Sequence, residues 1–266
     1  MAQRLDDQTV ESFRKDGVAV LRGVFADWVE TLRAGVAADM ANPDPKARIY
    51  DDPNGGGRFF VDYCNWARIA EYKDFIFNSP AAEIAAELMG SRTVQLFHEH
   101  VLVKEAQSGI PTPWHQDAPY YCVEGPKTVS LWVPLDEVPR ERTLEFVAGS
   151  HEWGKNYRPQ RFNGEALNEN DGLEEVPDID GNRDDYDVVG WALSPGDAVA
   201  FDYRVVHGAP ANDSPSTQRR AFSLRLVGDG TTFRRREGIV TSPPFPDVTL
   251  QDGEPLRGEE FPVLLG

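Results

Sequence analysis

A histidine and an aspartate lie two residues apart in the segment PTPWHQDAPYY, residues 111–121. The segment is too rich in proline and aromatic residues for a helix, and in an extended chain residues i and i+2 point to the same side. His115 and Asp117 would then present an imidazole and a carboxylate together, two thirds of a common type of metal site. The spacing alone is weak evidence, because five histidines among 44 acidic residues give about one such pair by chance. A third ligand is needed.

A candidate third ligand ends the segment DAVAFDYRVVH, residues 197–207. Its pattern predicts one strand whose more apolar face holds Val199, Phe201, Tyr203, Val205 and His207. A histidine at the end of an inward face, just before the turn GAP, is placed to bind a metal at the mouth of a barrel. The alternative is a core histidine with an ordinary hydrogen-bond partner. Two imidazoles and one carboxylate leave three positions of an octahedral ion open, as in non-haem Fe(II) oxygenases, and the absence of thiolates favours iron over structural zinc.

An arginine that could bind an anion begins the segment RRAFSLRL, residues 219–226. In a strand, one face holds Arg219, Ala221, Ser223 and Arg225, and the other holds Arg220, Phe222, Leu224 and Leu226. The second face is suited to packing against helices, so Arg219 is predicted to point inward. A planar guanidinium binds both oxygens of a carboxylate. An arginine at the start of a strand is otherwise usually a surface residue.

The elements that must position these residues are mainly strands. After residue 90, alternating segments separated by turns predict strands at 93–104, 127–135, 143–149, 197–207 and 220–229, the pattern of a β sandwich or barrel. Before residue 90 we expect a short helix that ends near Gly17, a strand at 18–21, a helix through 26–40 and a helix from Ser79 to Gly90. The glycine-rich segment 51–66 is either a mobile flap or an anchored surface loop. Segment 165–187, with ten acidic residues and one basic residue, is interpreted as a solvated excursion, with a lid as the alternative.

Composition limits the classes of partner. The net charge of −17 argues against nucleic acid and anionic membrane surfaces, which require a basic surface. No apolar stretch approaches the roughly 18 residues of a membrane span, and the start MAQRLDDQTV has no secretory pattern, so a cytoplasmic location is expected. Cys64 and Cys122 are too few for a disulfide scaffold and are predicted to be reduced. A small-molecule substrate is expected, and the oligomeric state cannot be read from the sequence.

Five motifs together resemble one known family. FRKDGVAVLRGVF, WHQD, VAGSHEWG, FDYRVVHGAP and RRAFS follow one another between about Phe13 and Leu226, and the set resembles the phytanoyl-CoA dioxygenase family of Fe(II)/2-oxoglutarate oxygenases. The resemblance implies a mainly β fold, a double-stranded β-helix (jelly roll, cupin-like) flanked by helices. It implies a single domain over 1–266, with a helical part at about 1–90, a jelly-roll core at about 91–230 and an extension at about 231–266.

The resemblance also implies roles for individual residues. His115, Asp117 and His207 match the iron positions, and Arg219 matches the arginine that binds the distal carboxylate of the cosubstrate 2-oxoglutarate, with Arg220 as the alternative if the register shifts. Trp132 and His100 match cosubstrate contacts, although each can equally be an ordinary core or surface residue. Many members have a serine at the position of Ala209; its absence here removes one hydrogen bond to the cosubstrate, for which Ser223 is a possible substitute. His151, in the motif GSH, is interpreted as structural.

The implied reaction uses Fe(II), 2-oxoglutarate and O₂, releases succinate and CO₂, and hydroxylates an unactivated C–H bond. Related halogenases replace the ligand carboxylate with a small residue, so Asp117 favours hydroxylation. Candidates for the wall of a substrate pocket are Phe59, Phe60, Tyr63, Trp66, Tyr120 and Tyr121, with Arg58 for an anionic group, although each is also a candidate for simple packing. The competing hypothesis is a cupin-type metal protein, an isomerase or a binding module, which would have no need of Arg219.

Overall fold

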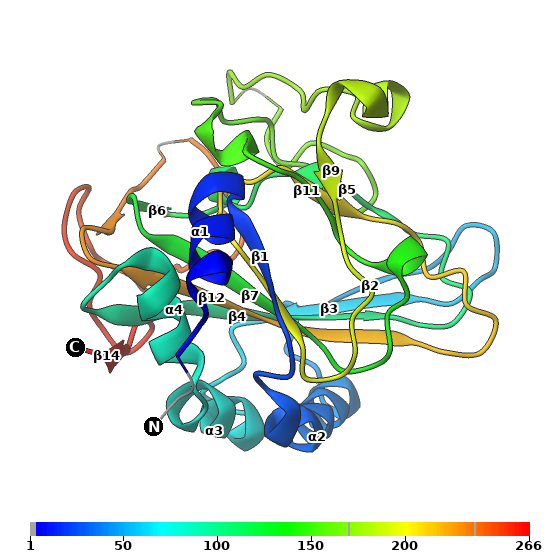
Figure 1. Cartoon of the computed structure of the whole chain (residues 1–266), viewed down its shortest axis with the longest axis horizontal. Coiled ribbons are helices and arrows are strands. Elements are labelled where there is room, and N and C mark those ends of the chain that lie inside the picture. Colours follow the sequence, from blue (N-terminus) through cyan, green and yellow to red (C-terminus); the bar gives the residue numbers. More distant parts are fainter. Residues whose placement is uncertain (1–3, 170, 237) are drawn as a thin grey trace.

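Two antiparallel β-sheets form the body of the protein (Figure 1). The computed structural model describes residues 4–169, 171–236 and 238–266. The larger sheet has the order β1-β10-β7-β12-β4-β3-β2, with β14 also paired to β4, and the smaller sheet has the order β5-β11-β8-β9. Aromatic side chains of the two sheets meet between them: the rings of Phe201 and Phe146 lie 5.1 Å apart. The space between the sheets therefore begins as an apolar core.

The strands of the larger sheet are β1 (Val18–Leu21), β2 (Arg48–Tyr50), β3 (Phe59–Tyr63), β4 (Val94–Lys104), β7 (Thr128–Pro134), β10 (Ala198–Phe201), β12 (Arg219–Gly228) and β14 (Val263–Leu265). The smaller sheet consists of β5 (Thr112–His115), β8 (Glu145–Val147), β9 (Val188–Val189) and β11 (His207–Ala209). A third pair joins β6 (Val123–Glu124) to β13 (Thr232–Phe233). The predicted strands at 18–21, 93–104, 127–135, 143–149 and 220–229 are confirmed to within two residues at each end.

Four α-helices pack around the larger sheet: α1 (Asp7–Asp16), α2 (Val29–Ala41), α3 (Ala70–Asn78) and α4 (Ala81–Met89). The outward face of β12 contacts them, since the ring of Phe222 lies 4.9 Å from that of Tyr72 and 5.4 Å from that of Phe75. The predicted orientation of this strand is therefore confirmed, with Arg219 on the opposite face. Gly17 ends α1 at φ 73° and Gly90 ends α4 at φ 57°, as expected of left-handed caps. Helix α3 was missed by the sequence reading.

Two predicted extended segments are shorter than expected. Segment 197–207 is not one strand: β10 ends at Phe201, a turn follows, and His207 begins β11 in the other sheet. In segment 111–121 the strand ends at His115, and Asp117 has helical torsions, φ −72° and ψ −41°. The alternation argument therefore does not hold at either place, although the same residues meet.

The glycine-rich segment 51–66 is anchored to the sheet. Its second half is β3, hydrogen-bonded to β4 with Phe59 opposite Lys104. Gly56 and Gly57 lie so close to the carbonyls of the 106–107 turn that a Cβ would collide with them. Asp52 accepts a hydrogen bond of 2.6 Å from the amide of Gly109. Of the two interpretations, the structure supports the anchored loop over the mobile flap.

Both cysteines are free, as predicted, and burial raises the pKa of each thiol, that of Cys122 to about 11. Over the three described ranges, no helix has the length and apolar character needed to cross a bilayer.

A buried carboxyl group on β4 makes stability depend on pH. Glu99 is fully buried and accepts a hydrogen bond from the amide of Asn65, and burial raises its pKa to about 8 from an ordinary value of 4.5. The folded protein therefore holds this proton up to a pH at which the unfolded chain has lost it. The stabilisation is complete below pH 4.5 and is lost as the pH rises through 8. Asp39, whose pKa burial and the neighbouring Asp62 raise to about 7, acts in the same direction.

We predict that Glu99→Gln flattens the pH profile of unfolding. The amide keeps the neutral form at every pH, so the variant should lose less free energy of unfolding between pH 5 and 8, by an amount on the order of 3 kcal/mol. The measurement is urea denaturation at a series of pH values, with the exposed Glu83→Gln on α4 as control. Parallel profiles for the wild type and Glu99→Gln would contradict the prediction.

Candidate metal centre and cavity

The predicted ligands converge between the two sheets. Strands β5 and β11 are neighbours in which His207 lies opposite His115, with their ring centroids 4.2 Å apart. Asp117 follows β5, and its Oδ1 lies 3.8 Å from Nε2 of His115. One donor atom from each of the three side chains can be chosen so that all lie within 4.8 Å of one another. This spacing fits a single metal ion held by two nitrogens and one oxygen.

Hydrogen bonds of the backbone orient both imidazoles. Nδ1 of His115 lies 2.8 Å from the carbonyl of Pro113, and Nδ1 of His207 lies 3.0 Å from that of Val205. A carbonyl can only accept, so each Nδ1 carries the proton and each Nε2 keeps its lone pair for a metal. Burial, followed by the neighbouring His115, lowers the pKa of His207 to about 3, and burial likewise lowers the pKa of His115. Both rings are therefore neutral, the form that binds metal.

Groups around Oδ2 of Asp117 keep this carboxylate ionised. Burial favours the neutral acid, but Arg225, His207, His115 and the hydroxyl of Ser130 together outweigh it and keep the pKa of Asp117 well below its usual range. Oδ2 accepts a hydrogen bond of 2.9 Å from Ser130 and lies 3.6 Å from the guanidinium of Arg225. Oδ1 is the oxygen that faces His115. The second oxygen is thus occupied by the protein, and the first is left for a metal.

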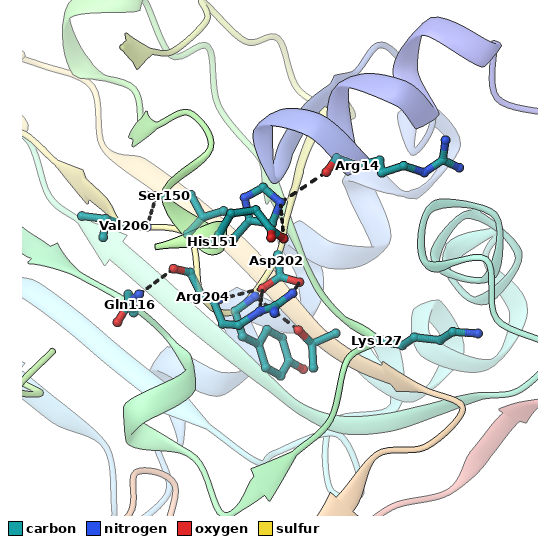
Figure 2. A network of polar contacts seen from close by, with 12 residues as sticks. Arg14, Gln116, Lys127, Ser150, His151, Asp202, Arg204 and Val206 are labelled. Carbon is teal, nitrogen blue, oxygen red and sulfur yellow. Dashed lines mark hydrogen bonds and ion pairs between the residues drawn. The ribbon is translucent and has the colours of Figure 1, made fainter. Parts of the chain in front are cut away.

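A network of polar contacts fixes the turn that presents His207 (Figure 2). Asp202 accepts hydrogen bonds from the amide and from the guanidinium of Arg204, at 2.9 and 2.8 Å, and Ser150 accepts one of 2.8 Å from the amide of Val206. His151, the predicted structural histidine, is buried beside this network, with Nε2 3.2 Å from the carbonyl of Arg14. The turn between β10 and β11 is therefore held in place by its neighbours.

Gln116 connects the two ligand segments. It lies between His115 and Asp117, and its Nε2 donates hydrogen bonds to the carbonyl of Arg204 at 2.7 Å and to that of Lys155 at 3.1 Å. Its Oε1 accepts one of 3.1 Å from the amide of Tyr157. The sequence reading missed this residue, because its partners are distant in the chain.

We predict that Gln116→Ala weakens metal binding by roughly tenfold, since support around the ligands typically contributes on this scale. Gln95→Ala is the matched control. Nε2 of Gln95 also donates to two carbonyls, those of Leu256 and Phe261, but far from the metal ligands. Both variants should unfold at lower temperature, and only Gln116→Ala should bind Fe(II) more weakly in a competition titration with a chelator. Equal metal affinities would show that Gln116 only stabilises the fold.

One cavity contains most of the predicted site. The triad lines it together with Arg219, Trp132, His100, Tyr63, Tyr120, Tyr121 and Ala209. Ser223 lies on the inward face of β12, opposite Trp132 and His100, with its hydroxyl buried and unpartnered among the described residues. The inward face of β12 therefore holds the cosubstrate candidates Arg219 and Ser223, whereas the metal ligands come from the segments that meet at β5 and β11.

The inner end of the cavity carries two buried cations. Arg219 lies opposite Lys104 in the sheet, and both are buried. Among the described residues, both donate only to backbone carbonyls: Lys104 to Pro210 at 3.2 Å, and Arg219 to Pro210 at 3.3 Å and to Arg142. Burial and the neighbouring Arg142 lower the pKa of Arg219 to about 10, and burial and Arg219 lower the pKa of Lys104 well below its usual range. No carboxylate of the described chain balances this pair, so it is suited to an anion that enters from the cavity.

The model of one protein family, phytanoyl-CoA dioxygenase (PhyH), matches residues 13–221. The chain belongs to the phytanoyl-CoA dioxygenase family. A comparison with curated proteins gives no match.

Several solved structures share the fold. The non-heme alpha ketoglutarate dependent epimerase SnoN from nogalamycin biosynthesis is 25% identical, with a TM-score of 0.75 over 97% of this chain and 98% of that one. The carbocyclase SnoK from the same biosynthesis is 23% identical, with a TM-score of 0.74 over 98% and 97%. EctD from S. alaskensis, solved with 2-oxoglutarate and 5-hydroxyectoine, is 23% identical, with a TM-score of 0.67 over 95% and 86%. The predicted jelly-roll fold is confirmed.

Some of the residues predicted for the site lie outside the cavity of this protein. Arg58 forms an exposed ion pair with Glu105, 2.8 Å away, so it does not reach a substrate there. Arg220 pairs with Asp136 at 2.6 Å on the face of β12 opposite to Arg219, which decides between the two possible registers. Phe60 and Trp66 pack in the core with the helices.

Other residues line the cavity but were not predicted as part of the site. His98 lies opposite Arg225, and both line the cavity. Nδ1 of His98 lies 3.1 Å from a backbone carbonyl, and its Nε2 is buried with no partner among the described groups. The inward face of β4, which continues from His100 to His98, could have revealed this residue. Arg225 shares the predicted inward face of β12, and only the position of Asp117 reveals its contact.

Proposed function

We propose that this protein is an Fe(II)- and 2-oxoglutarate-dependent oxygenase that hydroxylates an unactivated C–H bond of a small molecule. The observation that carries the proposal is the combination of two features in one cavity: a His-Asp-His set with free donor atoms, and a buried pair of cations that no carboxylate of residues 4–169, 171–236 or 238–266 balances. A metal site alone is common to many cupin-like proteins. The cation pair adds the second requirement, a place for a dicarboxylate.

The donor set fits a ferrous ion. His115 and His207 would bind through their Nε2 atoms and Asp117 through Oδ1, because the other atoms of these side chains are already engaged. Three protein ligands leave coordination positions for the cosubstrate and for oxygen. When bound, iron with 2-oxoglutarate supplies the oxidation of a C–H bond, coupled to release of succinate and CO₂.

Arg219 and Lys104 are the proposed partners of the distal carboxylate of 2-oxoglutarate. A carboxylate would favour the charged forms of both buried side chains, which lie opposite one another on β12 and β4. Trp132, on β7, lines the cavity and lies opposite Ser223 in the sheet. Ala209 offers no hydroxyl, so Ser223 and His100 are the proposed polar contacts on the opposite wall.

The outer part of the cavity is the proposed substrate site. Tyr63 and Tyr120 line it, and Tyr121 lies deeper, where its hydroxyl accepts a hydrogen bond of 3.0 Å from Arg225. Residues 160–162 and Leu167 cover it, and Tyr120 donates a hydrogen bond of 2.5 Å to the carbonyl of Gln160. This part of the long segment after β8 would exclude water from the reacting centre. The acidic residues that follow contribute no cavity wall in the described part of the chain.

The reaction outcome within this class requires product analysis. Similarity to an epimerase, a carbocyclase and EctD leaves several outcomes that begin with C–H oxidation. The carboxylate of Asp117 favours transfer of a hydroxyl group over a halide. A hydroxylated product gains one oxygen atom, a cyclised product loses two hydrogens, and an epimer keeps its mass.

The test has two steps. Anaerobic addition of Fe(II) and 2-oxoglutarate should produce a weak visible charge-transfer band, which neither component gives alone. Succinate release is then measured over a panel of candidate substrates, with the mass of each product. A protein that binds Fe(II) but gives no band with 2-oxoglutarate would be the cupin-type metal protein instead.

A further inference from the structure

Two arginines stand at the mouth of the cavity. Arg48, on β2, and Arg161, in the segment after β8, line both the cavity and the shallow hollow outside it. Other arginines of this acidic chain are paired at close range, for example Arg158 with Asp171 at 3.2 Å. In the part of the chain that the structure describes, neither Arg48 nor Arg161 has a carboxylate within ion-pair distance. Glu165, which lines the hollow, is beyond that distance from both.

Tyr50 lies beside both guanidinium groups. Burial raises the pKa of the Tyr50 hydroxyl, and Arg48 and then Arg161 oppose this rise. Glu165 adds to the rise. Arg48, Tyr50 and Arg161 line the same hollow, so the two guanidinium groups and the hydroxyl lie on the same side of the mouth. Tyr63 is also subject to the field of Arg48. A ligand at this position would meet two cations and the side chains of two tyrosines.

An aromatic wall leads inward from this point. The ring of Phe162 lies 5.7 Å from that of Tyr50 and 4.7 Å from that of Phe59, edge to face in both cases. Val61, Leu102 and Leu167 continue the apolar lining. A planar or aliphatic body fits against such a surface, whereas a sugar or a peptide backbone would lose hydrogen bonds there.

The two pairs of basic residues would bind different ligands. Lys104 and Arg219 lie at the inner end, where the proposed cosubstrate is bound. Arg48 and Arg161 line the shallow hollow outside the cavity as well as the cavity itself, and no group of the proposed cosubstrate accounts for them.

We propose that the substrate carries an anionic group, a carboxylate or a phosphate, on an apolar ring-containing body. The anionic group binds Arg48 and Arg161 at the mouth, and the body lies along the aromatic wall toward the metal centre. The inference rests on the proposed function, because it assigns the substrate class of the same cavity. It also replaces Arg58, the anion contact expected from the sequence, with two arginines that do line the cavity.

The experiment is a calorimetric titration of the Fe(II)-loaded protein, kept anaerobic and saturated with 2-oxoglutarate so that the inner cations are occupied. The probes share one ring system and differ in charge: naphthoate, naphthyl phosphate and the neutral naphthamide. At least one anion should bind at least about tenfold more tightly than the amide, since charge-assisted bonds to guanidinium groups are strong. The head group with the larger preference identifies carboxylate or phosphate as the native chemistry.

Variants of the two arginines test which residues cause the preference for the anionic probes. Arg48→Gln and Arg161→Gln should each reduce it, and the double variant should abolish it. Arg92→Gln, an exposed arginine before β4 and outside the cavity, should leave it unchanged. Equal binding of the three probes, no binding of either anion, or a preference that survives in the double variant would overturn the inference.

The absorption band of Fe(II) with 2-oxoglutarate is recorded on the same samples. A normal band without a charge preference refutes the anionic substrate and leaves the oxygenase standing. A preference that depends on Arg48 and Arg161 without the band refutes the oxygenase and leaves the anion site standing.

Discussion

Asp117→Ala is expected to lower the affinity for Fe(II) by roughly 100-fold and to abolish succinate release, since it removes the single anionic ligand of the triad. The loss is enlarged by Arg225. This guanidinium lies 3.6 Å from Oδ2 of Asp117, and without the carboxylate it would leave a buried positive charge facing the incoming metal ion. The measurement is an anaerobic competition titration of Fe(II) against a chromogenic chelator, together with succinate release.

Glu83→Ala is the control for this experiment, because it removes an exposed carboxylate from α4 and changes the net charge equally. Ser130→Ala should have a smaller effect than Asp117→Ala, since it removes only the hydrogen bond to Oδ2. If Asp117→Ala kept the iron affinity of the wild type, the three converging side chains would not be the metal site.

The sheet could be predicted from the sequence because its longest strands alternate regularly. In β12, the alternation of arginine, alanine and serine with phenylalanine and leucine fixed which side faces the helices, and the contact of Phe222 with Tyr72 confirms it. Helix α3 lacks a capping side chain at its start, since Ile69 occupies that position. A helix without start signals gives sequence reasoning little to use.

The ligands were predicted for a reason that the structure corrects. His207 was expected to face inward because 197–207 would alternate as one strand, but the chain turns after Phe201 and enters the other sheet. His207 reaches the metal centre because β11 pairs with β5, opposite His115. Turns of this kind depend on distant partners such as Ser150 and Gln116, which local periodicity does not report.

The rest of the cavity depends on pairing between distant segments. Lys104 faces Arg219 only because β4 and β12 are neighbours, and Arg161 reaches the mouth only because the segment after β8 folds over it. Arg58 illustrates the converse. Its position among aromatic residues suggested a substrate contact, but its partner Glu105 comes from the neighbouring strand end and holds it at the surface. Sequence position could identify residues of the right chemistry here, and the sheet order decided which of them face the cavity.

Arg219→Ala is expected to raise the dissociation constant for 2-oxoglutarate by roughly 100-fold, because truncating one partner of a buried charged contact typically costs 2–5 kcal/mol. At low cosubstrate concentration the visible band with Fe(II) should therefore disappear. 2-Oxoglutarate should also raise the melting temperature of Arg219→Ala less than that of the wild type at the same concentration, since ligand stabilisation increases with affinity. Fe(II) affinity itself should be unchanged, because the hydrogen bonds of Arg219 within the described structure go to the carbonyls of Arg142 and Pro210 and to none of the three ligands.

Arg220→Ala is the matched control, since it removes the next guanidinium in the same strand. That side chain pairs with Asp136 on the helix-facing side, so its loss should lower stability without changing the band at any cosubstrate concentration. Arg219→Lys tests geometry apart from charge: a point charge cannot bond both oxygens of a carboxylate, so its affinity should lie between those of the wild type and Arg219→Ala. Loss of the band in Arg220→Ala, with the band retained in Arg219→Ala, would reverse the assignment. An unchanged affinity in both variants would mean that the buried cations serve some other anion, and the oxygenase proposal would lose its main support.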